Sequence, residues 1–135
     1  MKLTCALTAD SVLIVNNEVL LVQRKHEPFQ GEWSFPGGFV EENEKVLDGA
    51  KRELEEETGV GDVVLVQFGA YGDPGRDPRG RTVSVVYLGL LDQKPQTKAA
   101  DDAAACGWFP IDQPPLMAFD HEKILSDIRE RLKNQ

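Results

Sequence analysis

The chain has 135 residues, a length that suits a single domain whose core is stable without disulfides or a structural metal. Hydrophobic residues make up 41% and charged residues 28%, an ordinary soluble composition. Fifteen Lys and Arg against 23 Asp and Glu give a net charge of −8, which argues against general nucleic-acid binding. A small phosphate-bearing ligand is still compatible, because its site needs only a few cations.

The two cysteines, Cys5 and Cys106, are isolated and show no spacing typical of a zinc site. We expect both to be reduced core thiols in a cytoplasmic protein. The apolar run at the N-terminus is too short and too polar for a signal peptide, and no segment reaches membrane-spanning length. We therefore expect no membrane partner.

The first third of the chain reads as strands followed by a loop. Residues 3–9 and 11–15 are expected to form two strands or one bent strand. An Asn-Asn turn at 16–17 leads into a second strand over 18–24, which makes a hairpin. Residues 26–38 contain Pro and Gly at short intervals and are expected to be a loop.

The clearest helix covers residues 43–58, with Asn43 as its N-cap and Gly59 at its C-terminal cap. Glu53, Glu56 and Glu57 fall within an arc of about 100° on this helix. The neighbouring arc is apolar and suited to burial: Val46, Leu47, Ala50 and Leu54.

The acidic arc costs helix stability. Glu53 and Glu57 are a like-charge pair four residues apart, and the helix C-terminus disfavours anions. A hard divalent cation would relieve this repulsion, because Mg²⁺ and Mn²⁺ prefer carboxylate oxygens. A solvated acidic face is the alternative, and helix chemistry by itself does not decide between them.

The remaining chain alternates strands and loops before a final helix. Strands are expected over 63–71, 81–91 and 105–110, with a Gly- and Pro-rich loop over 72–80 at the mouth of a site. An amphipathic helix over 121–133 has the apolar stripe Ile124, Leu125, Ile128 and Leu132. Strands on both sides of a central helix indicate a layered α/β domain.

The segment around the acidic helix has a recognisable spacing. Gly38 is followed after five residues by Glu44, and after seven more by RELEEETGV over residues 52–60. This pattern, GX5EX7REUXEEXGU with U aliphatic, resembles the Nudix box at every defined position. The resemblance implies one Nudix hydrolase domain over 1–135, with its box at 38–60. The implied fold is an α/β/α sandwich with a mixed sheet and a loop–helix–loop motif.

The resemblance also implies a site for Mg²⁺ or Mn²⁺. Glu56 and Glu57 are the implied ligands, Glu53 a ligand or water activator, and the Gly37 carbonyl a further ligand. Arg52 and Glu44 are expected to brace these carboxylates by hydrogen bonding. The ion would neutralise a diphosphate and activate a water, with a carboxylate as general base or as the group that orients the water.

The substrate is suggested by other segments. Residues 71–84 resemble the loop and strand of bacterial and archaeal ADP-ribose pyrophosphatases, and Pro74 matches the proline associated with that group. Residues 22–33, 36–41 and 115–125 are similar to the same group, so the implied reaction is ADP-ribose to AMP and ribose 5-phosphate. Arg81 departs from the pattern, since this group often has histidine there.

Several side chains are candidate substrate contacts. Arg76 and Arg79 either bind diphosphate or ribose oxygens, or pair with Asp73 and Asp77 to hold the loop. Arg24 either reaches phosphate or ends a strand at the surface. We consider Phe29 as a base-stacking residue, among four aromatic residues that otherwise pack in the core: Phe29, Trp33, Phe35 and Phe39.

Three further polar residues have open roles. Asp101 and Asp102 precede the last strand, and Asp102 is a candidate metal ligand, with a solvated loop acid as the alternative. His121 is expected to be a structural residue at the start of the last helix.

Two competing functions remain open. One is a nucleoside triphosphate pyrophosphohydrolase that removes oxidised nucleotides. The other is a non-catalytic nucleotide sensor, against which the complete set of carboxylates argues. An NADH pyrophosphatase is disfavoured because its signature after the box is missing. Many relatives are dimers, so the resemblance also implies a homodimer.

Overall fold

The computed structural model describes residues 1–98 and 103–134. Its strands and helices follow one another along the chain as β1 (Ala6–Val15), β2 (Glu18–Arg24), β3 (Trp33–Ser34), β4 (Gly37–Phe39), α1 (Val46–Thr58), β5 (Val66–Tyr71), β6 (Thr82–Leu90), β7 (Ala103–Pro110) and α2 (His121–Lys133).

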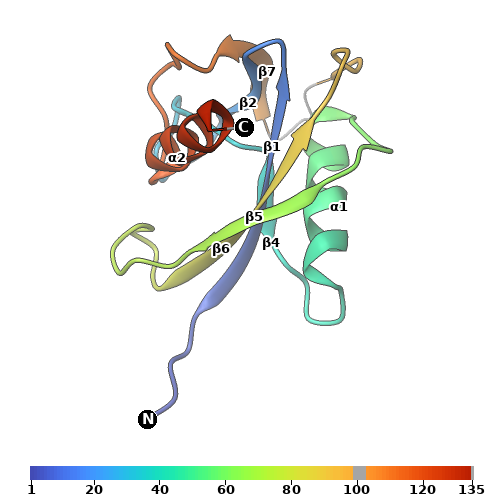
Figure 1. The fold of residues 1–135 in the computed structure, drawn as a ribbon. Coiled ribbons are helices and arrows are strands. Elements are labelled where there is room, and N and C mark those ends of the chain that lie inside the picture. Colours follow the sequence, from blue (N-terminus) through green and yellow to red (C-terminus); the bar gives the residue numbers. More distant parts are fainter. Residues whose placement is uncertain (99–102, 135) are drawn as a thin grey trace.

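The strands form one mixed sheet in the order β3-β2-β1-β6-β5, with β4 paired to β1 and β7 paired to β2. β1 and β6 run parallel, and the other pairs are antiparallel. α1 and α2 lie on opposite sides of the sheet (Figure 1). This is the predicted α/β/α sandwich with a mixed sheet.

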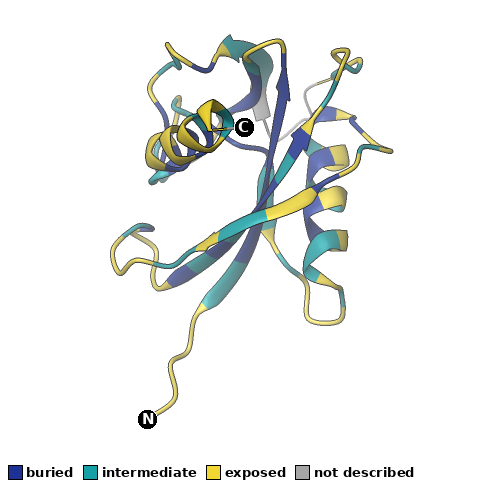
Figure 2. Ribbon diagram, viewed as in Figure 1, coloured by how far each residue is buried: buried dark blue, intermediate teal, exposed yellow. Residues whose placement is uncertain are grey.

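The core has two halves because the central strands are buried on both faces (Figure 2). Alternate residues of a strand point to opposite faces, so Leu13 packs on the α1 side while Val12 and Ile14 pack on the α2 side. Ala50 and Leu54 are buried on α1. The predicted stripe of α2 is confirmed: Ile124, Leu125 and Ile128 are buried, and Leu132 packs at the edge of that cluster.

The first strand is a single element that begins later than predicted. Its first ladder hydrogen bond runs from the Ala6 N–H to the Arg81 carbonyl, and its parallel partner begins at Thr82. Residues 3–5 therefore have no strand to pair with. Cys5 is exposed, so its prediction as a core thiol was wrong, whereas Cys106 is half-buried and both thiols are free.

The central helix begins three residues after the predicted N-cap. Lys45 occupies the N-cap position, and its side chain makes no capping hydrogen bond. The residues before it form a turn, in which the Glu44 N–H donates to the Glu41 carbonyl, and Glu44 itself lies outside the helix. Asn43 is therefore not the cap. Gly59 ends the helix in the left-handed conformation with φ of 77°, as predicted.

The segment 26–38 was predicted as a loop throughout, yet it contains β3 and begins β4. Both strands are short because each pairs with only part of a longer neighbour, β3 with β2 and β4 with β1. β5 begins at Val66 rather than 63, and β7 begins at 103 rather than 105. In the described part of the chain, no helix is long and apolar enough to cross a membrane.

Candidate active site

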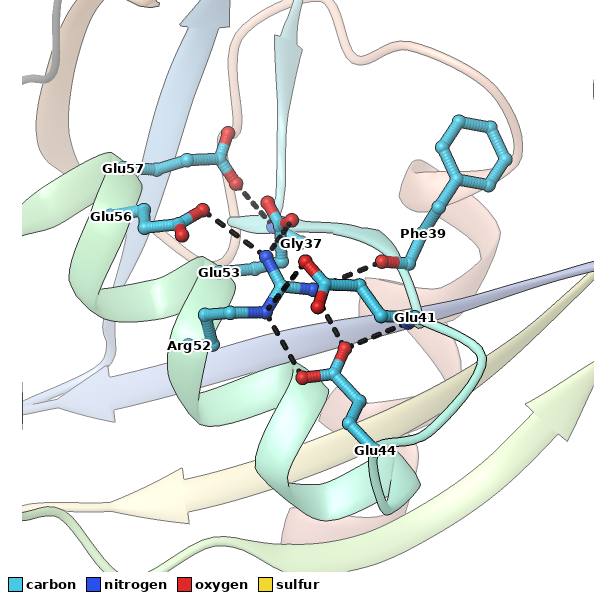
Figure 3. Close-up of polar contacts among 8 residues, drawn as sticks. All are labelled: Gly37, Phe39, Glu41, Glu44, Arg52, Glu53, Glu56 and Glu57. Carbon is cyan, nitrogen blue, oxygen red and sulfur yellow. Dashed lines mark hydrogen bonds and ion pairs between the residues drawn. The ribbon is translucent and has the colours of Figure 1, made fainter.

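Arg52, in the middle of the acidic helix, is the centre of a hydrogen-bond network (Figure 3). Its guanidinium donates to both Glu44 carboxylate oxygens at 2.7 and 3.0 Å, and to Glu53 Oε1 at 2.8 Å. It also donates to Glu56 Oε2 at 3.2 Å and to the Phe39 carbonyl at 3.1 Å. One planar cation thus links the loop before the helix to two of the three predicted carboxylates.

The charges of this network stabilise one another. Hydrogen bonds from Arg52, and then from the Glu41 N–H, lower the pKa of Glu44 from 4.5 to about 2. Hydrogen bonds to Glu44 and Glu53 in turn raise the pKa of Arg52. Glu44 is therefore ionised at neutral pH and holds Arg52 beside the acidic face of α1.

The third carboxylate has a different partner. Glu57 Oε1 accepts a 2.7 Å hydrogen bond from the Gly37 N–H, which ties the last turns of α1 to β4. Figure 3 shows Glu53, Glu56 and Glu57 projecting from α1 toward the segment that carries Gly37. Among the three carboxylates that accept hydrogen bonds from Arg52, Glu56 is the most accessible, with 58% of its side chain exposed.

Two glycines make this close approach possible. A Cβ on Gly38 would lie 2.6 Å from the Glu53 carboxyl carbon. A Cβ on Gly37 would lie 2.5 Å from the Ala9 carbonyl oxygen and 2.0 Å from Asp10 Oδ1. The absence of side chains at 37 and 38 therefore lets strand β4 pass between β1 and the carboxylates of α1.

The donors on α1 suit a hard divalent cation in kind, because all three are carboxylates. As they stand, however, no three His, Cys, Asp or Glu side chains of the described residues converge into a metal site. Arg52 supplies the positive charge beside Glu53 and Glu56. The candidate Asp102, like Asp101, lies outside the described residues.

A cavity of about 250 Å³ opens beside this network. Glu57 and Gly37 line it, and so do three of the predicted substrate arginines: Arg24, Arg76 and Arg79. Its remaining walls include Phe119 and polar side chains from β1, β6 and the start of α2. The cavity thus joins the acidic helix to a cluster of guanidinium groups.

The arginines of the cavity have different partners. Arg76 donates two hydrogen bonds to the carboxylate of Asp120, at 2.7 and 2.9 Å. Arg79 pairs with Asp77 through Nε at 3.1 Å and Nη2 at 2.9 Å, and the Arg79 N–H donates to the same carboxylate. Of the loop pairings considered from the sequence, that of Arg79 with Asp77 is present, whereas the Arg76 side chain pairs with Asp120 instead of Asp73.

Two arginines lie beside the Phe119 ring in the cavity wall. The guanidinium carbons of Arg24 and Arg79 lie 4.9 and 5.6 Å from the centre of the Phe119 ring. Arg24 Nε donates to the Pro28 carbonyl at 2.7 Å. Burial lowers the pKa of Arg24, and the charge of Arg79 lowers it further. Two guanidinium groups that repel each other beside a cavity favour an anionic ligand.

Residues 6–128 match the family model described as the NUDIX domain. The chain belongs to the Nudix family. It is 42% identical over 123 residues to an ADP-ribose pyrophosphatase of Methanocaldococcus jannaschii, a match that covers 90% of this chain and 72% of the relative. Nudix hydrolases in general use divalent metals.

Two further similarities are to a transcriptional repressor and to a Nudix domain solved with ADP ribose. The chain is 34% identical to the ADPR responsive transcriptional repressor NtrR of Acinetobacter baylyi, over 87% of this chain and 49% of the repressor. The Nudix domain of Shewanella oneidensis NrtR, solved in complex with ADP ribose, superposes with a TM-score of 0.87. It is 34% identical, and the match covers 97% of this chain and 90% of that one.

Two predicted substrate residues lie outside this Nudix cavity. Arg81 donates from Nη2 to the Gly72 carbonyl at 2.9 Å and is exposed, so it closes the base of the loop over 72–80. Phe29 packs edge-on against Phe119 at 4.9 Å between ring centres and does not itself line the cavity. Of the other aromatics, Phe35 is buried and Phe39 is 48% exposed.

The sequence analysis assigned no ligand role to Asp10 and His121, two buried polar residues of the Nudix cavity, nor to buried Ser84, which hydrogen-bonds to Asp10. Burial raises the pKa of Asp10 to about 6, although the hydrogen bond from the Ser84 hydroxyl opposes this change. Burial lowers the pKa of His121 to about 3. In the sequence, Asp10 could have pointed to these buried polar residues, because it is a charged residue between two apolar stretches of one strand.

Proposed function

We propose that the protein hydrolyses ADP-ribose to AMP and ribose 5-phosphate in a metal-dependent reaction. The observation that carries this proposal is a cavity lined both by Glu57 of the box and by Arg24 and Arg79. A diphosphate held by these guanidinium groups would lie beside the acidic helix. The similarity to the archaeal enzyme and to a domain solved with ADP ribose supports this substrate.

Glu53, Glu56 and Glu57 would hold Mg²⁺ or Mn²⁺, with the Gly37 carbonyl and Asp102 as further ligands. When bound, the ion supplies charge neutralisation of the diphosphate and a more acidic water. Glu56 is exposed enough to turn from Arg52 toward a cation. Arg52 and Glu44 position the carboxylates, and Glu53 orients the attacking water or takes its proton.

The remaining residues would serve the substrate. Arg24 and Arg79 would bind diphosphate oxygens, because both line the cavity beside Phe119. Both Arg76 and Arg79 pair with an aspartate, but the Arg76 side chain is only 5% exposed against 43% for Arg79, so Arg76 would mainly hold the cavity wall. Phe29 would support the Phe119 ring, and Arg81 would hold the loop that carries Arg76 and Arg79.

The test is hydrolysis of a substrate panel by the purified protein with Mg²⁺ or Mn²⁺. The panel contains ADP-ribose, NADH, ATP and 8-oxo-dGTP, and products are separated by ion-exchange chromatography. We expect AMP and ribose 5-phosphate from ADP-ribose, at a kcat/KM well above the other compounds. A preference for a triphosphate would instead make the protein a nucleotide-sanitising pyrophosphohydrolase.

A second candidate function is an ADP-ribose sensor, which the similarity to an ADPR responsive repressor and to a domain solved with ADP ribose favours. A sensor would bind ADP-ribose without turnover. Calorimetric titration in the presence of metal separates the two functions. Binding followed by the heat of hydrolysis supports the enzyme, whereas stoichiometric binding with recovery of intact ADP-ribose supports the sensor.

We also propose that the protein is a cytoplasmic homodimer. β5 lies at an edge of the sheet, and exposed apolar side chains lie on it and beside it: Val64, Val66 and Leu90. The two free cysteines suit a reducing compartment. Light scattering coupled to size exclusion tests the assembly, and a monomer at micromolar concentration would contradict it. Fractionation of cells tests the location.

A further inference from the structure

Two buried polar side chains face each other in the wall of the cavity. Asp10 of β1 is 6% exposed and His121, the first residue of α2, is 4% exposed, and both line the cavity. The His121 Nε2 and Asp10 Oδ2 atoms are 3.8 Å apart. This distance is too long for a hydrogen bond between them.

The proton of His121 is fixed by the backbone. The Phe35 N–H donates to His121 Nδ1 at 3.1 Å, so Nδ1 accepts and the neutral ring carries its proton on Nε2. Among the described residues, this Nε2–H has no hydrogen-bond acceptor. Because His121 lines the cavity, a ligand that accepts from this N–H would gain a hydrogen bond that the protein itself does not supply.

Asp10 presents the matching acceptor. Its Oδ2 accepts a short hydrogen bond from the Ser84 hydroxyl, which leaves further lone pairs on the carboxylate. Arg76, whose charge acts on Asp10, is engaged by Asp120 through two hydrogen bonds. The wall therefore offers one donor and one acceptor side by side, and the carboxylate would repel a phosphate group.

We propose that Asp10 and His121 together bind one ribose hydroxyl of the nucleotide substrate. A hydroxyl accepts from Nε2–H and donates to the carboxylate, so a single oxygen between the two atoms satisfies both. Neither a phosphate nor an apolar group does so. This assignment rests on the proposed function for the identity of the substrate.

The position of the pair favours a sugar over the nucleobase. Asp10 pairs with Gly37 across β1 and β4, and the Gly37 N–H contacts Glu57. The hydroxyl-binding pair thus adjoins the carboxylate that faces the diphosphate. In ADP-ribose each ribose is attached directly to the diphosphate, whereas the adenine is one sugar further away.

The first test combines two variants with deoxy substrates. In His121→Asn, the amide oxygen can still accept from the Phe35 N–H, but no group replaces Nε2. Asp10→Asn keeps the size of the side chain but removes the carboxylate. We expect the wild type to lose roughly 10–100-fold in kcat/KM on the analogue that lacks the bound hydroxyl. Both variants should lose a similar factor on ADP-ribose and no longer discriminate between the two substrates.

A matched control removes a polar contact elsewhere. Tyr71→Phe deletes the hydroxyl that donates to Asp127 at 2.8 Å, on the β5 side of α2. This variant should discriminate against the deoxy analogue as the wild type does. If the Asp10 and His121 variants lost the same factor in kcat/KM on ADP-ribose and on its deoxy analogues, the two residues would have a structural role only. That result would overturn the proposal.

The second test does not depend on turnover. Calorimetry compares binding of AMP with 2′-deoxy-AMP and 3′-deoxy-AMP, and of ribose 5-phosphate with 2-deoxyribose 5-phosphate. A loss of affinity in one series identifies the ribose that is bound, even if the protein prefers a substrate other than ADP-ribose. No difference in either series, or variants that respond only to a change of the base, would refute the hydroxyl contact.

Discussion

Among individual side chains, the carboxylate of Glu57 gives the sharpest test of the proposed chemistry. Glu57→Gln keeps the shape of the side chain but removes the negative charge beside Gly37. We expect kcat to fall by at least about 100-fold, because the loss of one precisely placed charged group at a reacting centre costs roughly that factor. Steady-state kinetics with ADP-ribose measures the effect, and circular dichroism checks the fold.

Glu55→Gln provides the matched control on the same helix. Glu55 occupies a position that the box leaves undefined, and it is exposed. Its loss should leave kcat within a factor of two or three. If Glu57→Gln turned over substrate as fast as Glu55→Gln, the assignment of Glu57 would be wrong.

His121 should make stability depend on pH. Its folded pKa of about 3 lies below the ordinary value of 6.5, so between these values the unfolded chain binds the extra proton. Its contribution to stability is therefore lost as pH falls through 6.5. Between pH 7.5 and 4.5 the free energy of unfolding of the wild type should drop by about 2–3 kcal/mol relative to His121→Asn. Urea titrations at the two pH values measure this difference, and parallel curves would contradict it.

The residues of the Nudix box were predictable because their spacing is local. Arg52 and Glu44 lie in one short segment, so helix geometry and the box pattern identify them without knowledge of the fold. Asp10 and His121 were not identified as a pair, since 111 positions separate them in the sequence. Only the packing of α2 onto the face of the sheet brings His121 to Asp10, in the middle of β1.

At the level of the elements, β4 depends on its two glycines for different reasons. In Gly37→Ala the new Cβ meets backbone atoms of Ala9 and Asp10, which cannot move without disrupting β1. We expect this variant to lose about 1–3 kcal/mol of stability, as in an overpacked core. Chemical unfolding measures the loss, and a variant as stable as the wild type would show that β4 can shift.

Gly38→Ala should behave in the opposite way. Its Cβ meets only the far end of the Glu53 side chain, which can swing away. Stability should stay within about 1 kcal/mol of the wild type, while displacement of Glu53 lowers kcat by roughly 100-fold. Unfolding and kinetics measured together on both glycine variants separate the two effects. Unchanged activity in Gly38→Ala would argue against a role for Glu53.

The boundaries of the elements were less predictable than their existence. Asn43 is a better N-cap residue than Lys45, and local preference therefore placed the helix start too early. The turn that carries Glu44 is instead set by Arg52, eight residues along the chain, which binds both oxygens of that carboxylate. A tertiary ion pair overrides the local preference at this point.

For the molecule as a whole, metal binding should appear as added stability. An ion that binds only the folded protein stabilises it by about 2.7 kcal/mol at 100 times its Kd. We therefore expect the melting temperature to rise with Mn²⁺ or Mg²⁺ concentration. The triple variant Glu53→Gln, Glu56→Gln and Glu57→Gln should melt at the same temperature with and without metal. A shift of the same size in the triple variant would locate the ion elsewhere.

The cavity is a property of the whole fold and could not be read from the sequence. Arg24, Glu57, Arg79 and Phe119 come from four separate segments that meet only when both faces of the sheet are covered. The sequence predicted Arg76 as a substrate contact or a partner of Asp73, because the loop over 72–80 was considered alone. Its actual partner, Asp120, arrives with α2 from 44 residues away.

The parallel pairing of β1 with β6 has a consequence for how the protein folds. Its nine register pairs run from Ala6–Thr82 to Ile14–Leu90, so every pair joins residues 76 positions apart. Closing so long a loop is entropically costly and slows folding. During synthesis, one edge of β1 therefore stays without its partner until residues 82–90 have left the ribosome. The acidic helix is made well before that moment, but the cavity beside it is completed only when the last third of the chain has arrived.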